Sequence, residues 1–143
     1  MRSAIATTLL VFSGWACAAP PEFSGDWVMD LRTPAERASQ LECGGARFQL
    51  SQSGSRIVGS HDMATVGCGR LNEGGAGSVR GVMVKDVAVL VVTSGRNGAV
   101  VIGTAQLRAG ALHWETLEEI RPGEPQGDAP LILGRGVLQR VPR

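Results

Sequence analysis

The amino-acid sequence predicts an all-β fold, an eight-stranded antiparallel up-and-down β-barrel with one short helix near its N-terminal end. Three observations lead to this prediction. After residue 45 the chain consists of short apolar segments separated by tight turn signals. Glycine recurs within these segments at a spacing of 22 residues, at Gly59, Gly81 and Gly103. A meander of eight strands can close on itself, which removes its exposed edges. A β-sandwich is the alternative architecture.

Residues 1–18 are predicted to be a cleavable signal peptide, and residues 19–143 a single β-barrel domain. Arg2 precedes an uncharged apolar run, and Ala16-Cys17-Ala18 offers a small-x-small cleavage site. The apolar run is too short to cross a membrane, which takes about 20 residues. The chain is therefore expected to be exported, periplasmic or secreted, and to have no membrane span.

Cleavage of this segment changes both the charge and the cysteine count. The whole chain has 14 basic and 13 acidic residues, so loss of Arg2 leaves 13 of each. This balance offers no basic excess for nucleic acid, which is not expected as a partner. Cys17 is lost as well, and Cys43 and Cys68 are expected to pair in an oxidising compartment. Closing the 25-residue span between them should contribute roughly 3–4 kcal/mol.

The first strand is expected over residues 27–31, followed by the helix. Thr33 is a suitable N-cap, Pro34 suits the first helical position, and Glu36 completes a capping box. The helix is predicted to continue for about two turns, to Leu41 or Glu42, because Cys43-Gly44-Gly45 then ends it.

The remaining chain is predicted to form seven strands. Their turns are signalled by Ser53-Gly54, Lys85-Asp86, Arg96-Asn97-Gly98 and Ala109-Gly110. Two glycine-rich or proline-rich stretches, residues 63–77 and 121–130, are predicted loops. The predicted strands span residues 46–52, 56–62, 78–84, 87–93, 99–108, 111–120 and 131–141.

The three regularly spaced glycines fall in the interiors of predicted strands. Glycine weakens a strand interior, so a recurring one indicates sharp bending or a close approach of the backbone. Glycine kinks of this kind help a sheet to close into a barrel.

The segment Phe23-Ser24-Gly25-Asp26-Trp27 resembles the GxW opening of the lipocalin and avidin superfamily, the calycins. It is also similar to the start of small exported bacterial lipocalin-like proteins. The resemblance implies that Trp27 closes one end of the barrel against an arginine near the last strand, Arg135 or Arg140. An avidin-type aromatic cage is missing, because residues 19–143 contain no Tyr and only Trp27 and Trp114 as tryptophans. Biotin binding is therefore not expected.

The sequence shows no catalytic or metal-binding pattern. His61 and Asp62 are neighbours on a strand and point to opposite faces, so they are interpreted as a polar strand end. His113, Glu115 and Glu119 are interpreted as an outward polar face, since two ligands at i and i+2 do not make a stable metal site. No catalytic residue, metal or cofactor is predicted.

Three classes of function are consistent with these features. The first is a non-catalytic exported binding protein that recognises another protein, of inhibitor or immunity type, through barrel loops. The candidate contact loops are residues 63–77, 93–98 and 121–130, with Ser94, Gly95, Arg96 and Asn97 as a compact exposed loop. The second class is a carrier of a small apolar ligand inside the barrel, and the third is an enzyme of unknown type. A cavity of several hundred Å³ inside the barrel would favour the carrier.

Overall fold

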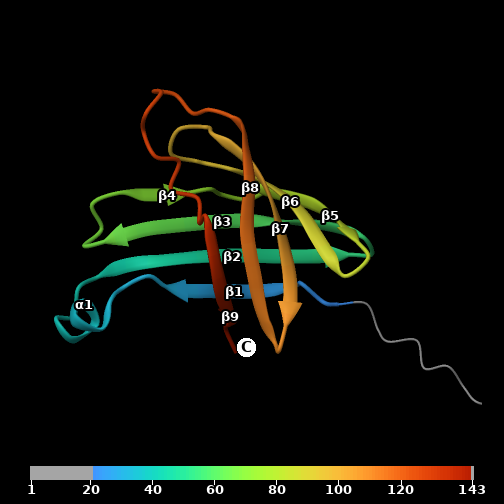
Figure 1. Cartoon of the computed structure of the whole chain (residues 1–143), viewed down its shortest axis with the longest axis horizontal. Coiled ribbons are helices and arrows are strands. Elements are labelled where there is room, and N and C mark those ends of the chain that lie inside the picture. The colour runs from blue at the N-terminus through green and yellow to red at the C-terminus, as the bar shows by residue number, and fades with distance from the viewer. Residues whose placement is uncertain (1–20, 143) are drawn as a thin grey trace, which may run out of the picture.

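In a computed structural model, which describes residues 21–142, eight antiparallel strands close into a barrel (Figure 1). The order around the barrel is β1-β2-β3-β5-β6-β7-β8-β9, and β9 returns to β1. The predicted all-β barrel with one short helix is thereby confirmed, whereas the predicted signal peptide lies outside the described residues. The elements are β1 (Gly25–Asp30), α1 (Pro34–Ala38), β2 (Cys43–Ser53), β3 (Arg56–Val66), β4 (Leu71–Glu73), β5 (Val79–Val84), β6 (Val87–Thr93), β7 (Val100–Arg108), β8 (Ala111–Arg121) and β9 (Arg135–Arg140).

The β2–β3 hairpin is the longest feature of the barrel and crosses the whole molecule in Figure 1. Its turn is Gly54-Ser55, where Gly54 adopts a φ of 59°. The predicted turn, Ser53-Gly54, is one residue earlier, and a hairpin closed there would put Cys43 opposite residue 64. That register is wrong by two residues, because Ser53 pairs with Arg56 and Cys43 therefore pairs with Val66.

The predicted loop over residues 63–77 is partly wrong. Strand β3 continues to Val66, and β4 pairs with its Asp62–Ala64 segment. These residues form strands because β2 supplies main-chain partners from far along the chain, which local glycine content does not reveal. Strand β5 pairs with the other half of the same edge of β3, so β4 and β5 lie end to end along it.

The predicted start of helix α1 is confirmed. Thr33 Oγ1 accepts a hydrogen bond from Glu36 N at 3.3 Å, and Glu36 Oε2 accepts one from Thr33 N at 2.6 Å. The helix ends at Ala38, earlier than the predicted Leu41 or Glu42. None of its residues is buried, so tertiary packing does not stabilise a further turn.

The last strand begins later than predicted. Strand β9 starts at Arg135, and residues 131–134 form a strap that leaves the sheet. The Leu131 carbonyl accepts a hydrogen bond from the Asn72 side chain, and Leu133 N donates to the His61 imidazole. These main-chain groups therefore bond to side chains instead of a neighbouring strand.

The regularly spaced glycines allow the close backbone approach that their spacing predicted. A Cβ atom on Gly59 would lie 1.9 Å from Gln49 O, and one on Gly81 would lie 2.1 Å from Val89 O. At Gly103 the neighbour is a side chain, because a Cβ atom would lie 2.4 Å from Trp114 Cη2. The strands can pack this tightly only because these positions carry no side chain.

The barrel interior is packed with aromatic and aliphatic side chains. The Phe48 ring lies 5.1 Å from the Trp114 ring and 4.6 Å from the His61 ring, measured between centroids. All three side chains are fully buried, as are Leu90 and Leu112 around them. Such packing at the centre of the barrel resembles an ordinary protein core.

Candidate functional site

Three loops meet at one end of the barrel and form a cluster held by buried polar side chains. The β6–β7 and β8–β9 connections lie at the same end, above β4 in Figure 1. The predicted contact loop at residues 94–97 lies within this cluster. We call the cluster, comprising residues 72–75, 94–98 and 121–133, the loop cluster.

Ser94 ties the β6–β7 connection to the β8–β9 connection. Its hydroxyl donates a hydrogen bond to Pro130 O at 2.7 Å and accepts hydrogen bonds from Arg96 N at 3.1 Å and Asn97 N at 3.4 Å. The residue is only 2% exposed. Ser94 was expected in an exposed loop, but its position at the end of β6 turns it inward.

Asn97 also ties the β6–β7 connection to the β8–β9 connection. Its Nδ2 donates to Asp128 O at 2.8 Å, and its Oδ1 accepts from Ala99 N at 3.1 Å. Gly123 packs directly against it, since a Cβ atom there would lie 2.3 Å from Asn97 Cγ. Asn97 is therefore also buried, in contrast to the expected exposed loop.

Asn72 joins all three loops. Its Nδ2 donates to Leu131 O at 2.9 Å, and its Oδ1 accepts from Gly95 N at 2.8 Å. Gly95 lies so close to β4 that a Cβ atom would be 2.2 Å from Glu73 O. Sequence reasoning missed Asn72, because it fell within a stretch interpreted as a glycine-rich loop.

Gly95 and Arg96 are the exposed part of the predicted contact loop. The Arg96 guanidinium forms two hydrogen bonds with the Asp128 carboxylate, Nε to Oδ2 at 2.8 Å and Nη2 to Oδ1 at 3.2 Å. A bidentate pair of this kind fixes the orientation of both side chains. The hydrogen bonds of Arg96 and its neighbours thus fix the conformation of the loop within the barrel itself.

His61 was interpreted as part of a polar strand end, and this interpretation is wrong. The imidazole is fully buried in the barrel, where Nε2 accepts a hydrogen bond from Leu133 N at 3.3 Å. Nδ1 is buried and has no hydrogen-bond partner among the described residues. Burial lowers the pKa of His61 to about 4 and keeps the ring neutral near pH 7. Because β3 alternates its side chains, Asp62 points to the outside of the barrel.

His113 and Glu115 lie partly exposed on the outer face of β8, and Glu119 is exposed further along the strand. The Glu115 carboxylate pairs with Arg135 instead of approaching His113 as a ligand set. Within residues 21–142, no group of three or more His, Cys, Asp or Glu side chains could hold a metal ion.

Trp27 and Arg140 lie opposite each other where β1 pairs with β9, whereas Arg135 begins β9 opposite Glu115 of β8. Arg140 places its guanidinium 4.5 Å from the centroid of the Trp27 ring, and its Nη2 donates to Glu22 O at 2.9 Å. Trp27 Nε1 donates to Phe23 O at 2.9 Å. Arg135 points away and pairs with Glu115, so Arg140 is the arginine that stacks on Trp27.

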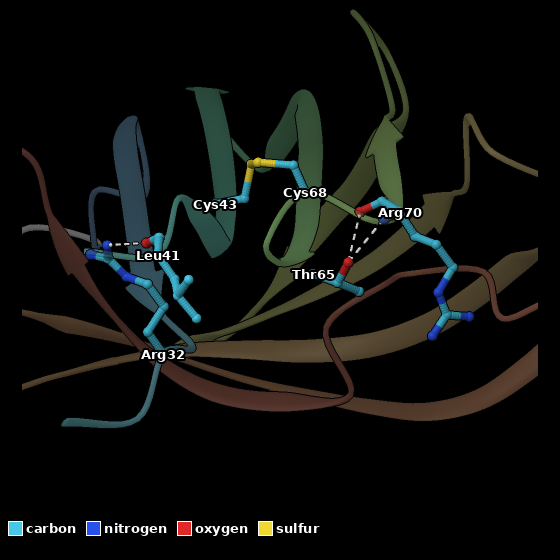
Figure 2. Close-up of a disulfide and its surroundings, with 6 residues drawn as sticks. All are labelled: Arg32, Leu41, Cys43, Thr65, Cys68 and Arg70. Carbon is cyan, nitrogen blue, oxygen red and sulfur yellow. Dashed lines mark hydrogen bonds between the residues drawn. A yellow bond between two sulfur atoms is a disulfide. The ribbon is translucent and has the colours of Figure 1, made fainter. Parts of the chain in front are cut away.

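The predicted disulfide between Cys43 and Cys68 is confirmed (Figure 2). It ties the open end of the β2–β3 hairpin to the turn that leads into β4, with the two Cα atoms 5.2 Å apart. Beside it, Thr65 Oγ1 accepts a hydrogen bond from Arg70 N at 2.9 Å. A disulfide is compatible with an oxidising, exported location.

Scans of this chain against protein-family models, curated proteins and solved structures found no match. The resemblance of residues 23–27 to the calycin opening therefore stays a prediction. Within residues 21–142 the structure contains no helix that is long and apolar enough to cross a membrane. The fold and the loops together define the class as a closed, disulfide-linked β-barrel with a rigid loop cluster at one end.

Proposed function

We propose that the protein is a non-catalytic, exported binding protein that recognises another protein, of inhibitor or immunity type, through the loop cluster. The observation that carries this proposal is the pair of hydrogen bonds made by buried Asn72, which lock Gly95 and Leu131 in place. A loop held rigid before binding loses little conformational freedom when it meets a partner, which favours affinity.

The exposed part of the loop cluster has the chemistry of a recognition surface. Gly95 exposes main chain, and Arg96 exposes a guanidinium whose orientation is fixed by Asp128. Arginine is enriched among the residues that contribute most to protein–protein binding. Arg96 is therefore the residue whose replacement should affect partner binding most.

The interior of the barrel supports this proposal over a carrier of apolar ligands. Phe48, His61 and Trp114 occupy its centre, and the Phe48 ring contacts the rings of both other residues. The hollows of about 870 and 980 Å³ along β2 and β3 open on the outer wall. An enzyme that used His61 would need substrate to reach an imidazole that is fully buried.

The test is a comparison of variants in partner capture. The purified protein is immobilised, exposed to an envelope extract, and the retained proteins are quantified by mass spectrometry. We expect a protein that is retained by the wild type and lost with Arg96→Ala and Asn72→Ala. Arg108→Ala is the matched control, because Arg108 is an exposed arginine at the end of β7, at the opposite end of the barrel.

Two outcomes would contradict the proposal. Equal retention by the wild type and Arg96→Ala would remove the loop cluster as the binding surface. A small apolar molecule found with the purified protein by native mass spectrometry, together with no captured protein, would support the carrier instead.

A further inference from the structure

The outer face of β3 and its neighbours β4 and β5 carries two pairs of charged side chains that lack ion-pair partners. Arg56 and Arg80 lie towards the turn of the β2–β3 hairpin, and Asp62 and Glu73 lie towards its open end. Within residues 21–142, none of these four residues takes part in an ion pair. Asp62 Oδ1 accepts one hydrogen bond, from Gly74 N at 3.3 Å.

The pairing register places these charges symmetrically about Ser60. Two residues before Ser60, Val58 lies opposite Arg80 of β5. Two residues after it, Asp62 lies opposite Glu73 of β4. Because β4 and β5 pair with the same edge of β3, the basic and the acidic side chain lie on the same side of β3 and at equal distances from Ser60.

The next positions outward are also symmetric, and here the residues on β5 and β4 are apolar. Four residues before Ser60, Arg56 lies opposite Val82, and four residues after it, Ala64 lies opposite Leu71. The side chains of Val82 and Leu71 are 50% and 46% exposed. Apolar residues this exposed beside unpaired charges are typical of an association surface.

We propose that this face binds a second copy of the chain, about a two-fold axis that lies in the interface and crosses β3 at Ser60. Such an axis runs across β3, so the β3 strands of the two copies point in opposite directions. The edges of β3 that pair with β4 and β5 lie on the same side in both copies. The axis therefore places Arg80 of one copy over Glu73 of the other, and Val82 over Leu71. Each contact occurs twice, as a two-fold interface requires.

The shape of the face suits this arrangement. An open hollow of about 980 Å³ is lined by Arg56, Arg80 and Val82, and one of about 870 Å³ by Asp62, Leu71 and Glu73. In the two-fold pair, the hollow around the carboxylates of one copy receives the long arginine side chains of the other. Sheets that pack face to face with nearly aligned strands are a common arrangement.

The size of the face is close to what a stable dimer needs. Eleven-residue strands β2 and β3, with β1 on one side and β4 and β5 on the other, form this face. At about 3.3 Å per residue and about 4.8 Å between strands, the 37 residues of these five strands cover roughly 590 Å², and protruding side chains add to this area. Stable interfaces bury about 800 Å² per partner.

Charge reversal tests the proposal by sedimentation equilibrium of the purified protein. We expect the wild type to have twice the monomer mass at micromolar concentration and low salt. Arg80→Glu and Glu73→Arg should each weaken self-association by roughly tenfold or more, because each places like charges together at both contacts. An equal mixture of the two variants should recover the dimer. In the mixed pair, the two substituted side chains face each other with opposite charges at one contact, and the native Arg80–Glu73 pair forms at the other.

Arg108→Glu, which reverses an exposed arginine far from this face, is the control and should leave the dimer intact. Thermal melting of each variant establishes that it is folded. A monomeric wild type under these conditions would overturn the proposal. So would a dimer that survives both reversals, or folded single variants that stay monomeric when mixed. The loop cluster variant Arg96→Ala should dimerise normally, which separates this proposal from the proposed function.

Discussion

The Asn72 side chain and the Leu131 carbonyl, 59 residues apart in the chain, are joined by a buried hydrogen bond of 2.9 Å. This bond holds the strap of residues 131–134 against β4 at the end of the barrel. The same side chain accepts the Gly95 N–H, so one amide fixes two connections. Asn72 thus joins Ser94 and Asn97 as a buried polar residue that holds the loop cluster together.

Replacing Asn72 by Ala should lower the free energy of unfolding by about 2–4 kcal/mol, because Leu131 O and Gly95 N both lose their buried partner. Urea unfolding measures the loss. Hydrogen exchange at Gly95 N should become faster at the same time. Gln139→Ala, on exposed β9, is the control and should change stability little. Unchanged stability together with unchanged exchange at Gly95 would show that Asn72 does not hold the loops.

His61 should make stability depend on pH. Burial lowers its folded-state pKa from 6.5 to about 4, so the unfolded chain binds more protons between these values. Stability should be fully present above pH 6.5 and should fall as the pH decreases towards 4, by up to about 3 kcal/mol. Urea unfolding from pH 7.5 to pH 4 provides the measurement.

His61→Leu isolates this effect, because carboxylate titration is common to both proteins. The difference in unfolding free energy between the wild type and His61→Leu should change as the pH falls, since only the wild type loses the His61 contribution. His113→Ala, which replaces a half-exposed histidine on β8, should keep the wild-type dependence. A constant difference across the range would mean that the His61 pKa is not lowered in the folded protein.

Gly103→Ala should destabilise the barrel by about 1–3 kcal/mol, since the added methyl group overpacks the core. Its Cβ atom would lie 2.4 Å from Trp114 Cη2 and 2.5 Å from Glu115 O. Denaturation followed by tryptophan fluorescence reports both stability and the Trp114 environment. Gly134→Ala is the matched control, because a Cβ atom there meets no heavy atom within 4 Å. If Gly103→Ala and Gly134→Ala lowered the free energy of unfolding equally, the close approach at Gly103 would be refuted.

Arg140→Ala and Arg135→Ala should differ in effect. Arg140 stacks over Trp27 and bonds to Glu22 O, so its loss should cost about 1 kcal/mol. The Arg135 side chain is 75% exposed in its pair with Glu115, so its loss should cost less than about 0.5 kcal/mol. Thermal melting of both variants side by side gives the comparison. A larger loss of stability for Arg135→Ala than for Arg140→Ala would contradict the assignment of Arg140 as the arginine that stabilises the barrel through Trp27.

Local signals in the sequence were sufficient to predict much of the barrel. Turns such as Lys85-Asp86 and Ala109-Gly110 are at the predicted positions, because each depends only on its own residues, with a positive φ at Lys85 in the first turn and at both residues in the second. The capping box at Thr33 is equally local. The pairing of Cys43 with Cys68 followed from their being the two cysteines left after the predicted cleavage.

The parts that were missed depend on distant partners. Strand β4 exists because β3 extends beside it, and the strap at residues 131–134 leaves the sheet because Asn72 and His61 bind its main chain. For His61 a signal was available: it lies four residues after Ile57 on β3 and therefore on the same inward face. For Asn72 there was none, since its role depends on loops that meet only in the folded protein.

The β1–β9 pairing has a further consequence for how the barrel fluctuates. These strands pair at Trp27–Arg140 and Val28–Gln139, whereas β2 and β3 pair along their whole length. Hydrogen bonds between neighbouring strands run all the way around the barrel. The short β1–β9 pairing contributes few of them, so it is the easiest part of this network to break. Local opening of the native state should therefore begin with the separation of β1 from β9. The stacking of Arg140 on Trp27 opposes this separation and sets how frequently it occurs.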